Sequence, residues 1–253
     1  MKIAIVTGAS SGIGREYVKQ LSDKYELDEI WAIARREDRL LELKSITKTL
    51  VIPIVLDITE KDSDEKLKNI LAEINPDVRV LVNAAGCGKI GAFEDISVSD
   101  NEQMLQLNVN ALTKITSRVL PYMSDGAEIF FMASRSGFHP VPYLSTYAAS
   151  KAYVLSLSRS INREMKYRNI RAIAVSPGWV RTEFIDRATL QDGVITYYNS
   201  FVTAESVVKR SFADIKKKKD VSICGASTRF QVFAAKMLPH KLVMWIWCKQ
   251  QKK

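Results

Sequence analysis

Residues 147–151 read YAASK, which places a phenol and an ammonium group four positions apart with only small side chains between them. On a helix, residues four apart lie on one face, so Tyr147 and Lys151 would point toward the same site. A free phenol has a pKa of about 10 and ionises too rarely at neutral pH to be an efficient base. A nearby cation stabilises the phenolate and lowers that pKa. The spacing therefore predicts a tyrosine that transfers protons, with room for a ligand against the helix.

The same five residues also fit an ordinary helix with a packed tyrosine and a solvated lysine, because short motifs often arise by chance. The surrounding elements decide between these interpretations. Short apolar runs predict strands at residues 2–8, 29–34, 49–57, 78–86, 127–134, 170–178 and 221–225. Amphipathic stretches predict helices at residues 13–24, 37–46, 62–74 and 145–167, with a further helical region between the fourth and fifth strands.

Strands that alternate with helices predict an α/β fold with one doubly wound, Rossmann-type parallel sheet of about seven strands and helices on both faces. We assign residues 1–228 to this single domain and residues 229–253 to a basic, apolar, helical tail. Ligands of such sheets bind beyond the carboxyl ends of the strands. The residues just after each strand are therefore the candidates for a site.

The composition is that of an ordinary globular protein, with 47% hydrophobic and 26% charged residues among 253. The net charge of +9 would suit an acidic partner. However, residues 203–253 carry 12 basic and three acidic side chains, so this segment holds the whole excess. Because the sequence contains no recognisable nucleic-acid-binding motif, we expect no nucleic-acid partner.

The three cysteines, Cys87, Cys224 and Cys248, are widely separated, and the two histidines are His139 and His240. A zinc site needs clustered thiolates or imidazoles, so we expect no metal. Few cysteines in odd number are typical of a reducing compartment, so we expect a cytoplasmic protein. We assign His139 to a loop, without a catalytic role.

A glycine-rich turn, TGASSGIG, follows the first predicted strand and opens the first predicted helix. Gly8, Gly12 and Gly14 allow backbone N–H groups to approach a ligand closely. The amino-terminal end of the helix attracts an anion such as a pyrophosphate, and Ser10 and Ser11 add hydroxyl donors. An ordinary tight turn is the alternative, but the position between strand and helix favours a dinucleotide site.

This turn, taken with NAAG (83–86), Asn108, Ser134, YAASK and PGWVRT (177–182), resembles the short-chain dehydrogenase/reductase family. The resemblance runs in order from residue 2 to about residue 225. It implies an oxidoreductase that interconverts a carbonyl and a secondary alcohol, with Tyr147 as general acid and base. The alternative on the same fold is a non-catalytic nucleotide sensor or scaffold, since fold alone does not establish chemistry.

The resemblance also implies roles for four catalytic residues, which are Asn108, Ser134, Tyr147 and Lys151. Lys151 would also bind the nicotinamide ribose, and Ser134 would hydrogen-bond the substrate oxygen. Asn108 would hold a water that relays protons, with Asn110 as the alternative. The sequence MASRSG departs from the family's commoner pair of adjacent serines, which makes Ser136 a rival of Ser134.

Two arginines follow the second predicted strand, where an acidic residue would bind the free ribose of NAD(H). Arg35 and Arg36 suit a 2′-phosphate, because a guanidinium pairs with phosphate in a bidentate way. We therefore predict NADP(H) rather than NAD(H), although Glu37 and Asp38 could balance these arginines at the start of a solvated helix. The family resemblance implies further cofactor contacts at Asp57, Ile58, Asn83, Ala84, Ala85, Gly86, Pro177, Gly178, Val180 and Thr182. With these, the complete set of predicted cofactor residues is Gly8, Ser10, Ser11, Gly12, Ile13, Gly14, Arg35, Arg36, Asp57, Ile58, Asn83, Ala84, Ala85, Gly86, Tyr147, Lys151, Pro177, Gly178, Val180 and Thr182.

The family resemblance implies that a loop at about residues 179–202 covers the substrate. After PGWVRTEF, which ends at residue 184, this segment shows no strand pattern. Its apolar side chains predict that the substrate is a bulky hydrophobic carbonyl or alcohol. The alternative is that these side chains simply pack the loop on the body. They are Ile185, Leu190, Val194, Ile195, Tyr197, Tyr198, Phe201 and Val202. In the tail, Pro239 predicts a break between two helices. The lysine-flanked run KLVMWIWCK would contact a membrane surface, another subunit or the substrate loop. We expect a homodimer or homotetramer.

Overall fold

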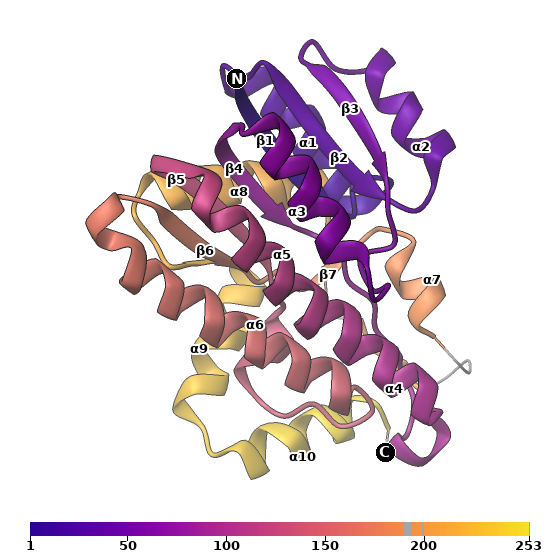
Figure 1. Ribbon diagram of the computed structural model, residues 1–253. Helices are drawn as coiled ribbons and strands as arrows, with labels where there is room; N and C mark the ends of the chain where they lie inside the picture. Colours follow the sequence, from indigo (N-terminus) through magenta and orange to yellow (C-terminus); the bar gives the residue numbers. More distant parts are fainter. Residues whose placement is uncertain (190–193, 199, 253) are drawn as a thin grey trace.

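A computed structural model describes residues 1–189, 194–198 and 200–252 (Figure 1). Within these residues the main feature is a parallel sheet of seven strands in the order β3-β2-β1-β4-β5-β6-β9. The strands are β1 (Lys2–Thr7), β2 (Glu29–Ala34), β3 (Leu50–Val55), β4 (Asp77–Asn83), β5 (Met123–Met132), β6 (Arg171–Val175) and β9 (Val221–Ser222). All seven strands that the sequence predicted are present, and the predicted fold class is confirmed.

The chain order reverses beside β1, which pairs with β2 on one side and with β4 on the other. Val6 near the end of β1 lies between Ala32 of β2 and Val82 of β4. In doubly wound sheets a crevice opens beyond the strand ends at such a reversal. The nearly continuous apolar character of these strands follows from burial on both faces.

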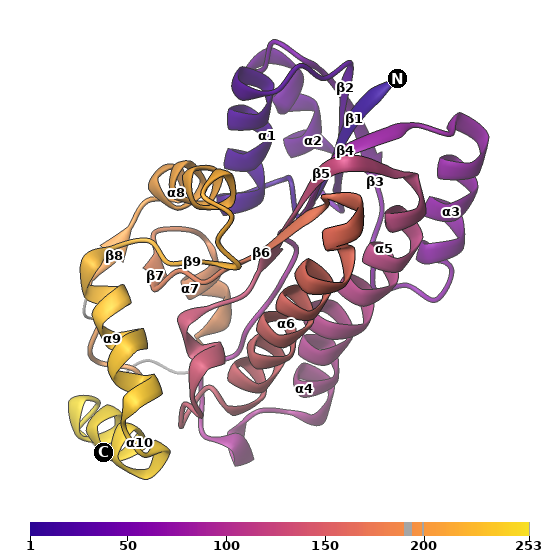
Figure 2. The same ribbon diagram turned by 90° about the vertical axis from the view of Figure 1, so that its left-hand side faces the viewer.

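Helices cover both faces of the sheet (Figure 2). One face carries α1 (Gly12–Lys24), α2 (Glu37–Leu41) with η1 (Glu42–Ser45), and α8 (Ala204–Lys216). The other carries α3 (Ser63–Ile74), α5 (Leu112–Val119) and α6 (Ser145–Glu164). The side chains of alternate strand residues, such as Ile5 and Val6, enter the two cores in turn.

Shorter helices connect these elements. They are η2 (Phe93–Asp95), α4 (Val98–Leu105), η3 (Gln106–Ala111), η4 (Leu120–Tyr122), η5 (Arg135–Phe138), η6 (Met165–Arg168) and α7 (Phe184–Ala188). The η3 segment is π-helical and joins α4 to α5 without a break. Such π segments inside helices are frequent at functional sites, and Asn108 lies in this one.

Two details differ from the sequence predictions. The helix predicted at 37–46 ends as an α-helix at Leu41 and continues as a tighter turn to Ser45. The predicted substrate segment contains a two-residue strand, β8 (Phe201–Val202), which pairs in parallel with β7 (Trp179–Val180). Periodicity did not predict this strand because an alternating pattern needs about four residues to be recognised.

The tail forms two helices, α9 (Ala226–Met237) and α10 (His240–Gln250), on either side of Pro239. Leu238 has an extended backbone, as expected for a residue that precedes proline. The Trp247 ring packs into a cluster with Leu144 and Trp179, and its indole N–H donates to the carbonyl of Pro142 at 3.0 Å. The tail therefore packs on the body. Among the described residues, no helix is both long enough and apolar enough to cross a membrane.

Candidate active site

A pocket of about 760 Å³ lies beyond the carboxyl ends of the central strands. Its lining begins at the glycine-rich turn, passes the ends of β2 to β6 and ends against α7, α9 and α10. It includes Ser134 and 19 of the 20 predicted cofactor residues, which are Gly8, Ser10, Ser11, Gly12, Ile13, Gly14, Arg35, Arg36, Asp57, Ile58, Ala84, Ala85, Gly86, Tyr147, Lys151, Pro177, Gly178, Val180 and Thr182. The structure therefore brings residues from the whole length of the domain to one cavity.

The glycine-rich turn has the shape that an elongated anion requires. Gly8 has a φ of 68°, a conformation that glycine adopts without strain. A side chain on Gly14 would place its Cβ 2.3 Å from the carbonyl oxygen of Gly8, so only glycine fits. The side chain of Ser11 makes no capping hydrogen bond to α1, which leaves the first N–H groups of that helix available to a phosphate. A pyrophosphate fits this turn.

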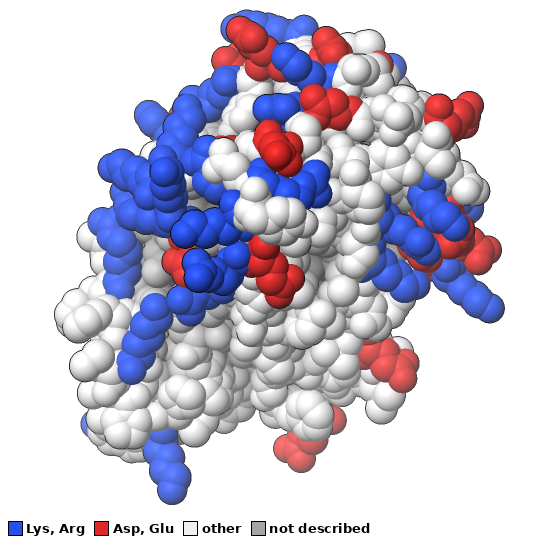
Figure 3. Space-filling view, turned by 60° about the vertical axis from the view of Figure 1, so that its left-hand side comes forward, with Lys and Arg blue, Asp and Glu red and all other residues white. Residues whose placement is uncertain are grey.

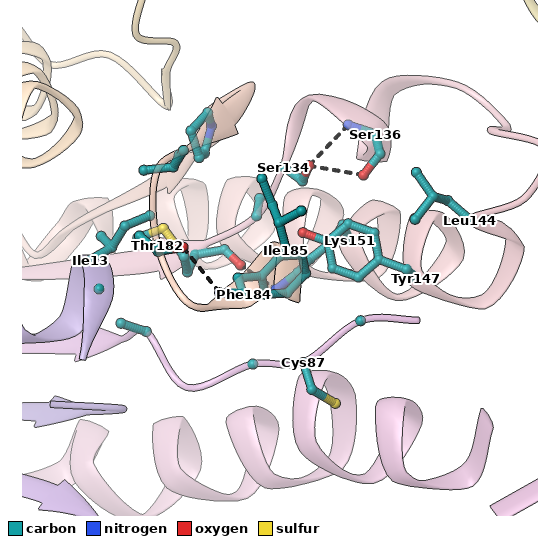
Figure 4. A pocket seen from close by; sticks show the side chains of 18 of the residues that line it. Ile13, Cys87, Ser134, Ser136, Leu144, Tyr147, Lys151, Thr182, Phe184 and Ile185 are labelled. Atoms are coloured by element: carbon teal, nitrogen blue, oxygen red, sulfur yellow. Dashed lines mark hydrogen bonds between the residues drawn. The ribbon is translucent and has the colours of Figure 1, made fainter. Parts of the chain in front are cut away.

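Ser134, Tyr147 and Lys151 come together on one wall of the pocket (Figure 4). The Nζ of Lys151 lies 5.6 Å from the centre of the Tyr147 ring and donates to the carbonyl of Met132 at 2.8 Å. The Ser136 hydroxyl donates to the Oγ of Ser134 at 2.9 Å. Because Ser134 accepts this bond, its own proton is available to another partner, and the neighbouring Tyr147 hydroxyl is one such partner. Ser136 therefore orients Ser134 and does not replace it.

The electrostatics of this wall differ from the sequence prediction. Burial raises the pKa of Tyr147 to about 12, while a hydrogen bond with the Ser134 side chain partly opposes this rise. Burial also lowers the pKa of Lys151 to about 8. The prediction that the ammonium makes the phenol more acidic is wrong for the protein without ligand, because the poorly solvated wall disfavours both charged forms. Tyr147 is therefore protonated at neutral pH.

The two predicted asparagines lie behind the pocket wall. Asn108 is fully buried, and its side chain bonds both backbone groups of Cys87 and, at 3.0 Å, the hydroxyl of Ser150. It thereby fixes the loop after β4 against α6. Asn83 is not among the residues that line the pocket, and it donates to Thr116 at 3.0 Å, so its role in cofactor binding stays a prediction. The alternative residue Asn110 is exposed on the far side of the same segment.

The predicted arginines lie at the tip of β2, each beside an acidic residue. Arg35 pairs with Asp57 at 3.4 Å. Arg36 directs its Nε and Nη2 at the hydroxyl of Ser10 and pairs through Nη1 with Glu183 at 3.1 Å. The Arg36 guanidinium holds the pKa of Glu183 below its usual value. Glu183 was not predicted, because its partner is 147 residues away in the sequence.

The apolar residues of the predicted substrate segment have different positions. Ile185 lines the pocket, whereas Val194, Ile195 and Tyr198 pack in the cluster that also contains Trp179 and Trp247. Tyr197 and Phe201 are exposed, and Val202 packs on the sheet. Leu190 lies outside the described residues. Within the described part of the segment, most of the apolar side chains therefore pack the loop on the body.

Known proteins are similar to this chain in sequence and in fold. A sequence model described as short chain dehydrogenase matches residues 2–192. The chain belongs to the short-chain dehydrogenase family. An uncharacterised oxidoreductase of Staphylococcus epidermidis is 30% identical to this dehydrogenase over 184 residues, which cover 72% of this chain and 79% of the relative.

Two further proteins are similar to this dehydrogenase. The very-long-chain 3-oxoacyl-CoA reductase of Bos taurus is 35% identical over 191 residues, which cover 71% of this chain and 60% of that reductase. A solved short-chain dehydrogenase from Sphingobium yanoikuyae, in complex with NADPH, is 25% identical with a TM-score of 0.78. The structural match covers 97% of this chain and 96% of the other, so the fold extends through α8 to the tail.

Several residues of the site were not predicted from the sequence. Cys87 and Arg135 directly follow predicted site residues and line the pocket. Gln231 and Trp247 line it from the tail. The sequence signal for Arg135 was the departure from the family's serine pair. No signal marked the tail residues, because their contribution depends on how α9 and α10 pack.

Proposed function

We propose that this dehydrogenase is an NADP(H)-dependent oxidoreductase that interconverts a carbonyl and a secondary alcohol on a hydrophobic substrate, with Tyr147 as general acid and base. One observation carries the proposal: Tyr147, Ser134 and Lys151 share a wall of the pocket that begins at the glycine-rich turn. A dinucleotide bound from that turn supplies or accepts the hydride. The side chains of the protein supply the proton and hold the substrate oxygen.

Each side chain has a role that its environment supports. The hydroxyl of Ser134 donates to the carbonyl oxygen and stabilises the alkoxide as it develops. Tyr147, protonated at neutral pH, gives its proton to that oxygen in the direction of reduction and takes it back in the direction of oxidation. Lys151, held by the carbonyl of Met132, keeps a polar group beside the phenol in a poorly solvated wall.

The preference for NADP(H) is supported by Arg35 and Arg36 at the tip of β2 and by the absence of an acidic residue at positions 34–36. A 2′-phosphate placed there would meet two guanidinium groups. The double variant Arg35→Ser, Arg36→Ser tests the preference by fluorescence titration with NADPH and NADH. We expect at least a tenfold loss of affinity for NADPH and little change for NADH. Equal losses for both cofactors would contradict the preference.

A hydrophobic substrate is supported by the apolar side of the pocket away from the glycine-rich turn. That side is formed mainly by aliphatic and aromatic side chains, which are Val141, Leu144, Trp179, Phe184, Ile185, Phe230, Leu238, Val243, Ile246 and Trp247. Apolar lining with a few polar groups is typical of small-molecule sites. We expect bulky ketones to be better substrates than small polar aldehydes.

The catalytic proposal is tested by following NADPH oxidation against a panel of ketones with wild type and Tyr147→Phe. Loss of the phenol should lower kcat/KM by about 10²–10⁴-fold, while NADPH binding persists. Tyr167→Phe, which removes the hydroxyl of an exposed tyrosine, is the matched control. Equal rates for wild type and Tyr147→Phe would refute the mechanism. Binding of NADPH without turnover of any ketone would favour the non-catalytic sensor or scaffold.

We also propose that the outer face of α9 and α10 contacts the surface of an anionic membrane. Phe230, Phe233, Met237 and Trp245 are more than half exposed on these helices. Arg229, Lys236, Lys241, Lys249 and Lys252 surround them, and residues 221–253 contain no acidic residue. In Figure 3 the surface at the lower left of the view is mostly white, and blue Lys and Arg side chains lie around it. Apolar side chains with a basic rim bind anionic lipid.

Flotation with vesicles of phosphatidylcholine and phosphatidylserine tests this contact. Wild type should float with mixed vesicles, and the double variant Phe233→Ser, Trp245→Ser should bind at least tenfold more weakly. Tyr167→Ser, at an exposed position on η6, is the control. Failure of wild type to float would refute the contact.

The homodimer or homotetramer stays a prediction. Analytical ultracentrifugation would measure the oligomeric state and would also show whether this face joins two copies of the chain.

A further inference from the structure

Arg135 directly follows Ser134 and lies in the wall of the pocket. The centre of its guanidinium is 5.8 Å from the ring centre of Trp179 and 5.9 Å from that of Trp247. Its Nη1 donates to the side-chain oxygen of Gln231 on α9. The group is therefore held by two indole rings and one amide, all of which also line the pocket. This arrangement fixes a cation in the wall of the pocket that also contains Ser134.

Arg135 has only neutral partners among the described residues. It takes part in none of the ion pairs that the described residues form. The acidic residues in the described pocket lining are Asp57 and Glu183, which pair with the arginines at the tip of β2. The tail supplies no acid either, because residues 221–253 contain none. Within residues 1–189, 194–198 and 200–252, the substrate side of the pocket thus holds a cation to which no acidic side chain is paired.

Such a cation is unfavourable unless other groups replace the water it has lost. Burial lowers the pKa of Arg135 to about 10, and the group still carries its charge at neutral pH. The indole faces compensate in part through cation–π attraction. A guanidinium has five N–H donors, and the described residues accept a bond only from its Nη1 group. The remaining donors can bind a planar anion in a bidentate way.

We infer that Arg135 is an anion-binding residue that selects carbonyl substrates carrying a carboxylate, sulfonate or phosphate group on an apolar frame. The inference rests on the proposed function and narrows its substrate class. Ser134 holds the reacting oxygen and Arg135 holds the anion, and both residues line the same pocket. The apolar side chains around Arg135 receive the rest of the molecule, and the anion supplies the missing counter-charge.

The pKa of His139 offers a second way to detect an anion bound at Arg135. It lines the pocket, and its pKa is lowered by burial and by the positive charges of Arg135 and His240, while a hydrogen bond with the Pro140 carbonyl opposes this. An anion bound at Arg135 would neutralise the repulsion from that guanidinium and so raise the pKa of His139. Since the chain contains two histidines, the imidazole signals can be assigned with a single His240→Gln variant.

The competing role for Arg135 is structural. Its contacts with Trp247 and Gln231 could serve to hold α9 and α10 over the pocket. A structural residue would affect charged and uncharged substrates alike. An anion-binding residue would affect the charged substrate far more, so the ratio of the two rates distinguishes the roles.

The experiment compares keto acids with their methyl esters as substrates for NADPH oxidation. The probes are benzoylformate and 4-oxo-4-phenylbutanoate, each with its methyl ester, and phenacyl phosphonate in place of a carboxylate. Wild type should have a kcat/KM at least tenfold higher for one or more anions than for the matching ester. Arg135→Met should lower that ratio by about tenfold to a hundredfold, the range of a hydrogen bond to a charged group. Arg135→Lys should restore it in part.

Arg163→Met, which removes an exposed arginine of α6, is the matched control and should keep the wild-type ratio. A wild-type ratio near one for every anion, or an unchanged ratio in Arg135→Met, would overturn the inference. Failure of the proposed function is distinguishable, because it would abolish turnover of esters and acids together. The NMR titration of His139 with the same acids needs no turnover. An unchanged His139 pKa at saturating acid would also overturn the inference.

Discussion

Lys151 is a titratable group in a nearly water-free position, and its environment predicts how the protein's stability changes with pH. The side chain lies in the pocket wall, and the residue is 3% exposed. Burial lowers the pKa of Lys151 from 10.5 to about 8. Between these values the unfolded chain binds a proton that the folded protein does not. The free energy of unfolding therefore rises with pH through this window, and the gain is lost as pH falls to about 8.

The magnitude follows from the width of the window. One pKa unit corresponds to about 1.4 kcal/mol. Between about pH 8 and pH 9.5, Lys151 should therefore add about 2 kcal/mol to the free energy of unfolding. Lys151→Met has no titrating group at this position. It also loses the hydrogen bond to the Met132 carbonyl, worth about 1 kcal/mol, but this loss adds a nearly constant offset.

The assay is urea unfolding of the ligand-free wild type and Lys151→Met at pH 7, 8 and 9.5. The difference in unfolding free energy should move by about 2 kcal/mol in favour of wild type from pH 7 to pH 9.5. Tyrosines and other lysines titrate in both proteins and cancel in this difference. Lys166→Met, at an exposed position in η6, is the control and should give a difference that does not depend on pH. A constant difference for Lys151→Met would show that burial does not disfavour the ammonium.

Three further predictions concern the pocket and its cover. Gly14→Ala places a Cβ 2.3 Å from the backbone oxygen of Gly8, so calorimetry should show at least a tenfold loss of dinucleotide affinity; wild-type affinity would contradict the role of the turn. Glu183→Gln removes the competitor of a 2′-phosphate for Arg36, so NADPH should bind up to about fivefold tighter while NADH is unaffected. Gln251→Ala removes the acceptor of two partly buried backbone N–H groups of the substrate segment, so hydrogen exchange there should accelerate; unchanged exchange would refute this contact.

The fold was predictable because it depends on local patterns. Runs such as 2–8 and 29–34 are apolar at nearly every position, which is expected only of strands that are covered on both faces. The alternation with helices then leaves few topologies. The glycine-rich turn and YAASK were predictable for the same reason, since each is a local motif whose position relative to a strand or helix fixes where it points.

The rest of the site depends on contacts between distant segments, which local patterns do not contain. Glu183 meets Arg36 across 147 residues, and Gln231 meets Arg135 across 96. The error about the acidity of Tyr147 has a related cause. The sequence shows that a lysine is near, but the loss of water around both groups depends on packing of the whole wall. Desolvation is a property of the tertiary structure, and it is the largest cause of the pKa shift of both residues.

This desolvated wall suits one direction of the proposed reaction. At neutral pH the raised pKa keeps the proton on Tyr147, and Ser134 accepts from Ser136 while sharing a hydrogen bond with Tyr147. Under the proposed mechanism, these two neighbouring hydroxyl groups would donate to the carbonyl oxygen in the direction of reduction. Oxidation would first need the phenolate, which at pH 7 lies about 7 kcal/mol above the phenol for a pKa of about 12. Under the proposed mechanism, the protonated phenol therefore favours the direction of reduction at neutral pH.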